Sequence, residues 1–201
     1  MFHKSIAEEF LNQTNKVVNY DFKSRKERRE KEGKLSMDFD VSKRNLIDIK
    51  SIFDQNKLVF WLIYGTLLGA VRDQNFISFD GDTDIGIHEE NKNDFIRCIP
   101  QILSKGFTLI RITEEEDLVT FMRDDEYIDI GIFRKEFDIN GKLFYAYQNH
   151  KEYSPSFENL VDIKFLGKVF KISKYSHSLL KRWYGNDWLT VKRNFPAYNA
   201  K

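Results

Sequence analysis

The sequence lacks several features that would place it in a special class of protein. A single cysteine, Cys98, excludes an intrachain disulfide and a cysteine-rich zinc site. The longest apolar run, Leu58 to Tyr64, has seven residues, whereas a membrane-spanning helix needs about 20. The net charge is only +1, without the basic excess typical of nucleic-acid binding, and Glu8 and Glu9 stand where a signal peptide would be apolar. We therefore expect a cytoplasmic protein that binds no nucleic acid.

The chain does contain enough apolar material for a folded domain. Hydrophobic residues make up 41% of its 201 residues and aromatics 15%, with 18 phenylalanines. A chain of this length buries roughly 70% of its unfolded surface. We predict an N-terminal helix (2–20) and a charged linker within 1–40, followed by one domain over 41–201. Helices early, then strands, then a helix favour an α+β fold with a mixed sheet.

Apolar periodicity and turn residues place the elements of this fold. Helices are predicted over 42–56, with Ser42 as the cap, and over 90–104 and 174–184. Strands are predicted over 59–64, 84–87, 107–112, 118–123 and 127–133, with hairpin turns at Asn140-Gly141 and Gly167.

The segment 23–34 is the most highly charged part of the sequence. It holds seven basic and three acidic residues and no apolar one. Such a segment is commonly a solvated linker or helix face. The alternative is a basic patch that contacts an anionic membrane surface or a phosphorylated acceptor.

The clearest chemical signal is the run FDGDTDIGI at 79–87. Asp80, Asp82 and Asp84 occupy alternate positions, and alternate side chains of a strand point to one face. Like charges held together there are costly unless a divalent cation neutralises them, and oxygen-only ligands favour Mg²⁺ or Mn²⁺. Asp80 with Gly81 could instead form a turn before the strand.

A second copy of the tetrapeptide Asp-Ile-Gly-Ile supplies a third carboxylate. Asp84 begins the first copy, and Asp129 begins the second inside the apolar strand YIDIGIF. A buried carboxylate needs a partner. If the two strands are neighbours, Asp129 joins Asp82 and Asp84 around one ion. A calcium loop starting at Asp80 is excluded, because Ile85 and Asn91 stand where Gly and Glu are required.

A strand-to-helix turn precedes these aspartates. Gly65 and Thr66 open a short helix and could offer backbone N–H groups and a hydroxyl to a phosphate, although most such pairs are only turns. Arg72 follows on the same helix and could bind a phosphate bidentately or pair with Asp73.

Taken together, these motifs resemble a known family. The block YGTLLGAVRDQNFISFDGDTDIGI (64–87), the later IDIGIF and the C-terminal LLKRWYGNDW (179–188) look like the three signature segments of the LicD/fukutin family. The chain departs from the usual pattern at Phe79, where tryptophan is common, and at Gly81, where a further carboxylate is common.

The resemblance implies a nucleotidyltransferase-like fold of the polymerase β type, with a mixed sheet flanked by helices. It implies metal-dependent transfer of a phospho-alcohol from a CDP-linked donor, such as CDP-choline or CDP-ribitol, to a glycan or lipid-linked glycan. By position, Asp82 and Asp84 match the metal-binding pair, Asp129 the third carboxylate and Asp80 a further acid. Gly65, Thr66 and Arg72 match the phosphate-handling turn.

Three other functions remain open from the sequence. The fold could transfer a nucleotide to a small molecule or protein, in which case pyrophosphate and not CMP would be released. A degenerate member could bind a glycan without catalysis, but this would predict the loss of a metal aspartate. A glycosyltransferase could use an Asp-x-Asp motif, but it would not need the Gly-Thr-Leu-Leu-Gly turn. The expected location is cytoplasmic, with peripheral contact at the inner face of a membrane through 23–34.

Overall fold

The computed structural model describes residues 5, 20–34, 36–113, 115–148 and 150–191. Apart from residues 5 and 20, the helix predicted over 2–20 lies outside these ranges. None of the helices in the described ranges combines the length and the apolar character that crossing a bilayer requires.

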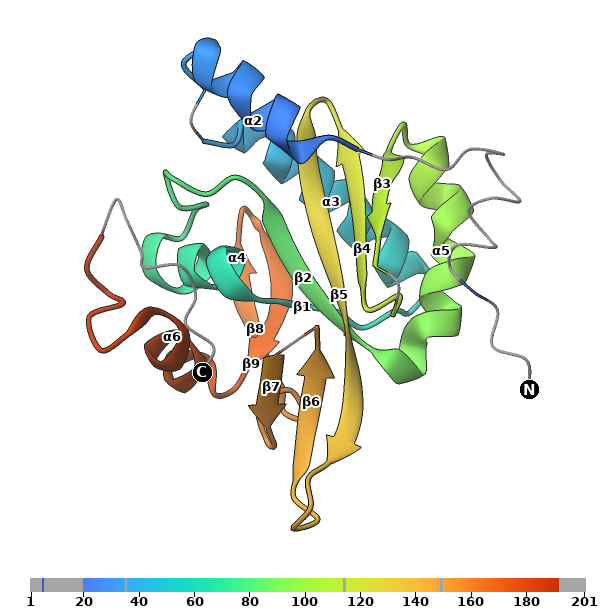
Figure 1. Ribbon diagram of the computed structural model, residues 1–201, viewed down its shortest axis with the longest axis vertical. Coiled ribbons are helices and arrows are strands. Elements are labelled where there is room, and N and C mark those ends of the chain that lie inside the picture. The colour runs from blue at the N-terminus through green and yellow to red at the C-terminus, as the bar shows by residue number, and fades with distance from the viewer. Residues whose placement is uncertain (1–4, 6–19, 35, 114, 149, 192–201) are drawn as a thin grey trace.

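The centre of the molecule is a seven-stranded mixed sheet (Figure 1). The strands run in the order β1-β2-β5-β4-β3; β2 and β5 are parallel, and the other neighbours are antiparallel. The second half of β5 pairs with β6, which pairs with β7. The strands are β1 (Trp61–Leu62), β2 (Thr83–His88), β3 (Thr108–Ile112), β4 (Leu118–Arg123), β5 (Glu126–Phe137), β6 (Leu143–Tyr147) and β7 (His150–Tyr153). The predicted α+β class with a mixed sheet is confirmed.

Helices flank this sheet. The α-helices are α2 (Phe22–Lys31), α3 (Phe39–Gln55), α4 (Tyr64–Leu68), α5 (Lys92–Ser104) and α6 (Ser176–Tyr184). A π-helical turn (Gly69–Asp73) extends α4, and a 3₁₀ turn (Glu89–Asn91) precedes α5. Helix α3 packs on β5 and α5, α4 contacts α6, and α2 crosses the end of the sheet where β4 turns into β5 (Figure 1). A separate hairpin, β8 (Leu160–Phe165) with β9 (Lys168–Ser173), lies against β1.

Helix α3 shows how the sequence pattern becomes the core. Its predicted apolar stripe, Leu46, Ile49 and Phe53, is fully buried. The helix begins earlier than expected, however, because Asp38 and not Ser42 is the cap: its carboxylate accepts the N–H groups of Asp40 and Val41, both at 3.1 Å. Aspartate is among the best N-cap residues, so the cap predicted at Ser42 was wrong.

Turn chemistry was predicted better than the length of the first strand. Hairpins form at Asn140-Gly141 and at Gly167, where the two glycines have φ of 75° and 80°. The strand predicted over 59–64 is much shorter, since only Trp61 and Leu62 pair with β2.

The basic segment 23–34 is largely helix α2, and one face of that helix is buried. Arg25 and Arg29 are only 9% and 7% exposed. Both lie within ion-pair distance of the buried Glu126, at 3.2 and 2.9 Å. The segment is therefore not a solvated linker but a helix held on the β4–β5 turn by buried charge pairs.

Candidate active site

Three aspartates converge at the end of the sheet that lies nearest α2. Asp82 immediately precedes β2, Asp84 lies within it, and Asp129 lies on β5. Each offers a carboxylate oxygen, and these oxygens all lie within 4.8 Å of one another. The juxtaposition of Asp129 with the Asp82–Asp84 pair, predicted from the repeated tetrapeptide, is therefore present in the structure.

The strand register explains why the repeat creates the cluster. In the parallel pair β2–β5, Asp84 lies opposite Asp129 and Gly86 opposite Gly131. The side chains at these alternate positions share one face of the sheet. A Cβ on Gly86 would lie 2.8 Å from the Trp61 ring, and one on Gly131 would lie 3.0 Å from the Tyr147 ring. Because the glycines have no side chains, the rings of Trp61 and Tyr147 can pack against the strands beside the carboxylates.

Asp129 is held by a row of side chains that crosses three strands. Thr120, opposite Asp129 on β4, donates its hydroxyl to one carboxylate oxygen at 2.6 Å. Arg111, opposite Thr120 on β3, donates from Nη2 to the other oxygen at 2.6 Å and from Nε to the Thr120 hydroxyl at 2.9 Å. Neither residue was predicted from the sequence to belong to the site. The sequence hinted at them only weakly, because each is a polar residue inside an otherwise apolar strand.

The negative charge of the cluster is only partly compensated, by the ion pair of Asp129 with Arg111. Burial raises the pKa of Asp84 well above its usual range, and the charges of Asp82, Asp80 and Asp129 raise it further. Burial and the Asp82 charge do the same to the pKa of Asp80. Burial raises the pKa of Asp129 to about 6, although Arg111 opposes the shift. Burial also raises the pKa of Asp82, and interactions with Asp80 and Tyr127 oppose the rise.

These residues fit a hard divalent cation. The donor set consists only of carboxylate oxygens, which Mg²⁺ and Mn²⁺ prefer. A cation would also offset the burial that raises these pKa values and the repulsion that adds to the rise for Asp80, Asp84 and Asp129. The acidic cluster Asp82, Asp84 and Asp129 could thus bind a divalent metal.

The predicted phosphate-binding turn at Gly65 and Thr66 contacts two of the aspartates, Asp80 and Asp84. The Thr66 hydroxyl is fully buried and accepts the N–H of Asp84 at 2.8 Å, so it fixes the start of β2. Gly65 lies against Asp80: a Cβ on Gly65 would come within 2.0 Å of the Asp80 carboxylate. The phosphate contacts predicted for Gly65 and Thr66 stay predictions.

Arg72 lies in the π-helical turn and has partners of its own. Its Nε and Nη2 donate to the two carboxylate oxygens of Asp73, each at 2.7 Å, and Nη1 donates to the Trp188 carbonyl at 3.4 Å. Its side chain is only 7% exposed. Arg72 therefore ties α4 to the segment after α6 in this structure, and the phosphate contact predicted for it remains a prediction.

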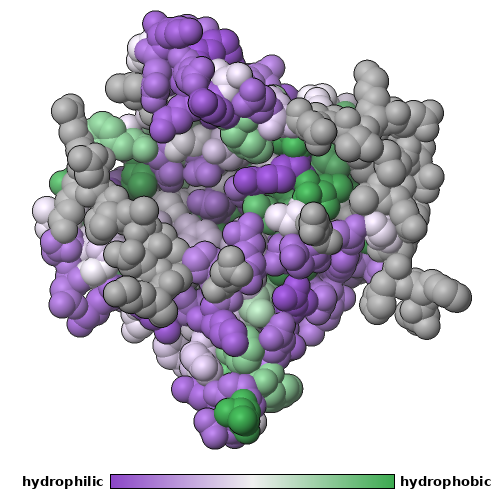
Figure 2. Space-filling view, in the orientation of Figure 1, coloured by the Kyte–Doolittle hydropathy of each residue, from purple (hydrophilic) through white to green (hydrophobic). Residues whose placement is uncertain are grey.

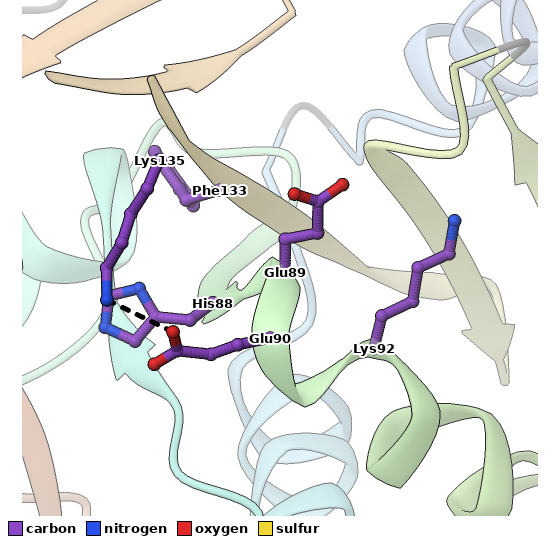
Figure 3. A pocket seen from close by; sticks show the side chains of 6 residues that line it. All are labelled: His88, Glu89, Glu90, Lys92, Phe133 and Lys135. Atoms are coloured by element: carbon purple, nitrogen blue, oxygen red, sulfur yellow. Dashed lines mark hydrogen bonds and ion pairs between the residues drawn. The ribbon is translucent and has the colours of Figure 1, made fainter. Parts of the chain in front are cut away.

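Two cavities frame the strands β2 and β5. One, of about 300 Å³, opens between α2 and the loop before β2, and its wall includes Gly81 and Tyr127 beside the acidic cluster. Figure 2 shows the surface below the strongly hydrophilic α2 as a hollow bordered by polar side chains. The other, of about 460 Å³, lies at the opposite end of the strands, where His88 ends β2 and Lys135 pairs with Glu90 (Figure 3). Only the first cavity adjoins the aspartates.

The contact between Gly65 and Asp80 can be tested by a double-mutant cycle. We expect Gly65→Ala to destabilise the fold by about 1–3 kcal/mol in urea unfolding, because the new methyl group displaces a buried carboxylate. In an Asp80→Ala background the same change should cost much less, since the obstructing group is gone. An equal cost in both backgrounds would show that the methyl group meets something else.

The raised pKa values predict how metal binding depends on pH. A carboxyl group whose pKa is raised on folding stabilises the fold below its unfolded pKa, near 3.8, and loses that contribution as pH rises through its folded value, about 6 for Asp129. Metal binds the deprotonated form. We therefore expect Mg²⁺ to raise the thermal unfolding midpoint strongly at pH 8 and little at pH 5. An Asp129→Asn variant should show a smaller rise at pH 8. Equal Mg²⁺ effects at both pH values in the parent protein would contradict this account.

The fold is similar to that of a solved antibiotic-resistance factor. The solution structure of the antibiotic-resistance factor ANT(2'')-Ia superposes with a TM-score of 0.50 at 10% identity, covering 73% of this chain and 72% of that one. The crystal structure of the lincosamide antibiotic adenylyltransferase LnuA in its lincomycin-bound form gives a TM-score of 0.48 at 14% identity, covering 68% and 83%. At these identities the likeness concerns the fold alone.

The sequence profile described as "LicD/FKTN/FKRP, nucleotidyltransferase domain" matches residues 57–172, and the chain belongs to this family. The uncharacterized protein RT0683 of Rickettsia typhi is 33% identical over 119 residues, which are 59% of this chain and 37% of that protein. The uncharacterized protein RP689 of Rickettsia prowazekii is 40% identical over 62 residues, 31% of this chain and 23% of that protein. The matched segments thus span well under half the length of these relatives.

Proposed function

We propose that this protein transfers a phospho-alcohol from a CDP-linked donor to a hydroxyl group of a glycan or lipid-linked glycan. The observation that carries the proposal is the convergence of Asp82, Asp84 and Asp129 on two adjacent parallel strands of a LicD-family domain. Family membership supports a transferase, and the all-carboxylate cluster supports phosphoryl chemistry. The donor and acceptor classes rest on the family resemblance of the motifs around these residues.

The reaction requires one bond to form and one to break. The acceptor oxygen forms a bond to the distal phosphorus of the donor, the bond between that phosphorus and the bridging oxygen breaks, and CMP leaves with the bridging oxygen. The acceptor hydroxyl gives up its proton in this step. When bound to Asp82 and Asp84, Mg²⁺ or Mn²⁺ would neutralise the negative charge of the diphosphate.

Asp129 is suited either to complete the metal site or to accept the acceptor's proton. Its pKa of about 6 lies near neutrality, where a general base works best. The hydrogen bonds from Arg111 and Thr120 fix the orientation of its carboxylate while each oxygen keeps a further lone pair. These two residues therefore act as positioning residues for Asp129.

The proposal is tested with a panel of CDP-alcohols. The purified protein is incubated with Mg²⁺, each donor and a mixture of neutral and phosphorylated sugars, and products are identified by mass spectrometry. The proposal predicts CMP together with a sugar whose mass has increased by the phospho-alcohol. An Asp84→Asn variant serves as the inactive control, and Asp162→Asn, on the exposed hairpin β8–β9, as the matched active control.

The same assay distinguishes the second class of reaction that the fold supports. Nucleotidyl transfer from a nucleoside triphosphate would release pyrophosphate and add a nucleotide to the acceptor. That result would show that the protein transfers a nucleotide and not a phospho-alcohol. The absence of any product across both donor classes would contradict both.

A further inference from the structure

The cavity of about 300 Å³ under α2 adjoins the acidic cluster through two of its walls. Gly81 stands directly before Asp82, and Tyr127 is close enough to Asp82 to lower the pKa of its carboxyl group. Tyr127 also lies two residues before Asp129 on the same face of β5. The cavity therefore lies beside the carboxylates, with Gly81 and Tyr127 between them.

The lining of the cavity combines aromatic rings with positive charge. Phe22, Phe79 and Tyr127 contribute rings, and Phe79 is 48% exposed. Among the lining residues that the structure describes, four are cations and one is an acid; they are Arg25, Lys26, Arg29, Lys34 and Glu30. Rings stack on the apolar face of a sugar, and cations bind an anionic group.

The four cations have different roles. Arg25 and Arg29 are buried and paired with Glu126, so they hold the helix in place. The side chains of Lys26 and Lys34 are 79% and 63% exposed, and their intrahelical or near-neighbour pairs with Glu30 and Glu32 are 4.0 and 3.0 Å long. Exposed pairs of this kind are weak, so both lysines can turn to a ligand in the cavity.

The position of α2 in the sequence indicates which substrate the cavity takes. The family profile matches 57–172, which includes the aspartates and the turn at Gly65. Helix α2 and Ser36, which form the outer wall of the cavity, lie before that range. Under the proposed function the CDP part of the donor is common to the family, so the matched range is expected to bind the donor. A wall from outside that range is then left for the other substrate, the acceptor.

We propose that the cavity between α2 and the loop before β2 binds the acceptor, and that this acceptor is a sugar carrying an anionic group. This inference rests on the proposed transferase function. The sugar ring stacks on Phe79 and Tyr127, and the anionic group lies between Lys26 and Lys34. The acceptor hydroxyl then faces Asp82 and Asp129 across the wall at Gly81.

The test uses N-acetylglucosamine 1-phosphate as the probe and N-acetylglucosamine as its neutral counterpart. Binding to the 201-residue chain with Mg²⁺ is measured by ligand-observed NMR. The phosphorylated sugar should bind at least about tenfold more tightly than the neutral sugar. A Lys26→Glu/Lys34→Glu double variant should lose this preference, and Phe79→Ala should weaken binding of both sugars.

A matched control separates the cavity from the general charge of the segment 23–34. Lys23→Glu/Lys31→Glu makes the same change of charge in that segment but outside the cavity lining. It should leave sugar phosphate binding unchanged. Equal losses in the two double variants, or equal binding of the two sugars, would overturn the inference. So would binding to vesicles containing phosphatidylglycerol that depends on Lys26 and Lys34 when the sugar phosphate does not bind, since that would assign the lysines to a membrane surface.

The donor reaction keeps the two proposals distinguishable. Release of CMP from a CDP-alcohol with water in place of the acceptor reports on the aspartates without the sugar, and Asp84→Asn should abolish it. CMP release without sugar phosphate binding would overturn the acceptor assignment and leave the proposed function standing. Sugar phosphate binding without turnover of any CDP-alcohol would overturn the proposed function, and the acceptor assignment with it.

Discussion

Replacing Asp84 with asparagine is expected to lower turnover by several orders of magnitude and to leave the fold intact. Asp84 shares its site with Asp82 and Asp129 within 4.8 Å, so the amide removes a charge that a divalent metal needs. The same substitution relieves repulsion in the metal-free protein, because burial and neighbouring charges already raise the pKa of Asp84 well above its usual range. Loss of activity and gain of metal-free stability should therefore occur together.

The measurement compares kcat and thermal unfolding for the parent protein and three variants. Asp82→Asn should behave like Asp84→Asn, and Asp162→Asn should behave like the parent protein because Asp162 is exposed on β8. Full activity in EDTA, or full activity of Asp84→Asn, would rule out the metal site. A large loss of stability in metal-free Asp84→Asn would contradict the expected repulsion. It would show that hydrogen bonds of the Asp84 carboxylate stabilise the fold.

Truncation of Glu126 to alanine should cost about 3–5 kcal/mol in urea unfolding, the usual cost of removing one partner from a buried ion pair. Glu126 is 2% exposed and lies within 3.2 Å of Arg25 and 2.9 Å of Arg29. It also accepts the N–H of Asp38, the residue that caps α3. Its loss leaves two buried guanidinium groups with reduced compensation and releases the start of a core helix.

The ion pairs of Glu126 with Arg25 and Arg29 need not be strongly stabilising for Glu126→Ala to destabilise the fold. Burial raises the pKa of Glu126 even with both arginines in place, so the attraction does not fully offset the cost of desolvation. The exposed pair of Asp162 with Lys171, at 2.7 Å, is the control, and Asp162→Ala should cost about 0–1 kcal/mol. A loss for Glu126→Ala as small as that of the control would mean that α2 is not anchored through this residue.

The aspartate cluster could be predicted from sequence because short sequence patterns define it. The alternation of Asp82 and Asp84 fixes one face of a strand, and the repeat at Asp129 marks a second strand of the same kind. Pairing the two strands in register then brings the carboxylates together, and the structure has this register. The metal and its role in turnover stay predictions.

The environment of the cluster could not be predicted, because it depends on contacts between distant segments. Arg25 and Glu126 are 101 positions apart in sequence, and the charge pattern of 23–34 alone is equally consistent with a solvated face. Arg111 reaches Asp129 only because β3, β4 and β5 are aligned side by side. The cap at Asp38 was missed for a similar reason: its backbone is positioned by Glu126, far along the chain.

The matched tetrapeptides on β2 and β5 also act as a safeguard against misfolding. A slip of one residue would exchange the two faces of a strand, moving an aspartate into the layer of Ile85 and Ile130 and an isoleucine into the site. A slip of two would set Asp84 against Gly131, separating it from Asp129 and disturbing the contact of Gly86 with Trp61. Misaligned pairings are therefore penalised by the same residues that form the site. The same positions thus serve both strand alignment and the chemistry of the site. A substitution that preserves the strand pairing can still damage the site, and one that preserves the site can still disturb the pairing.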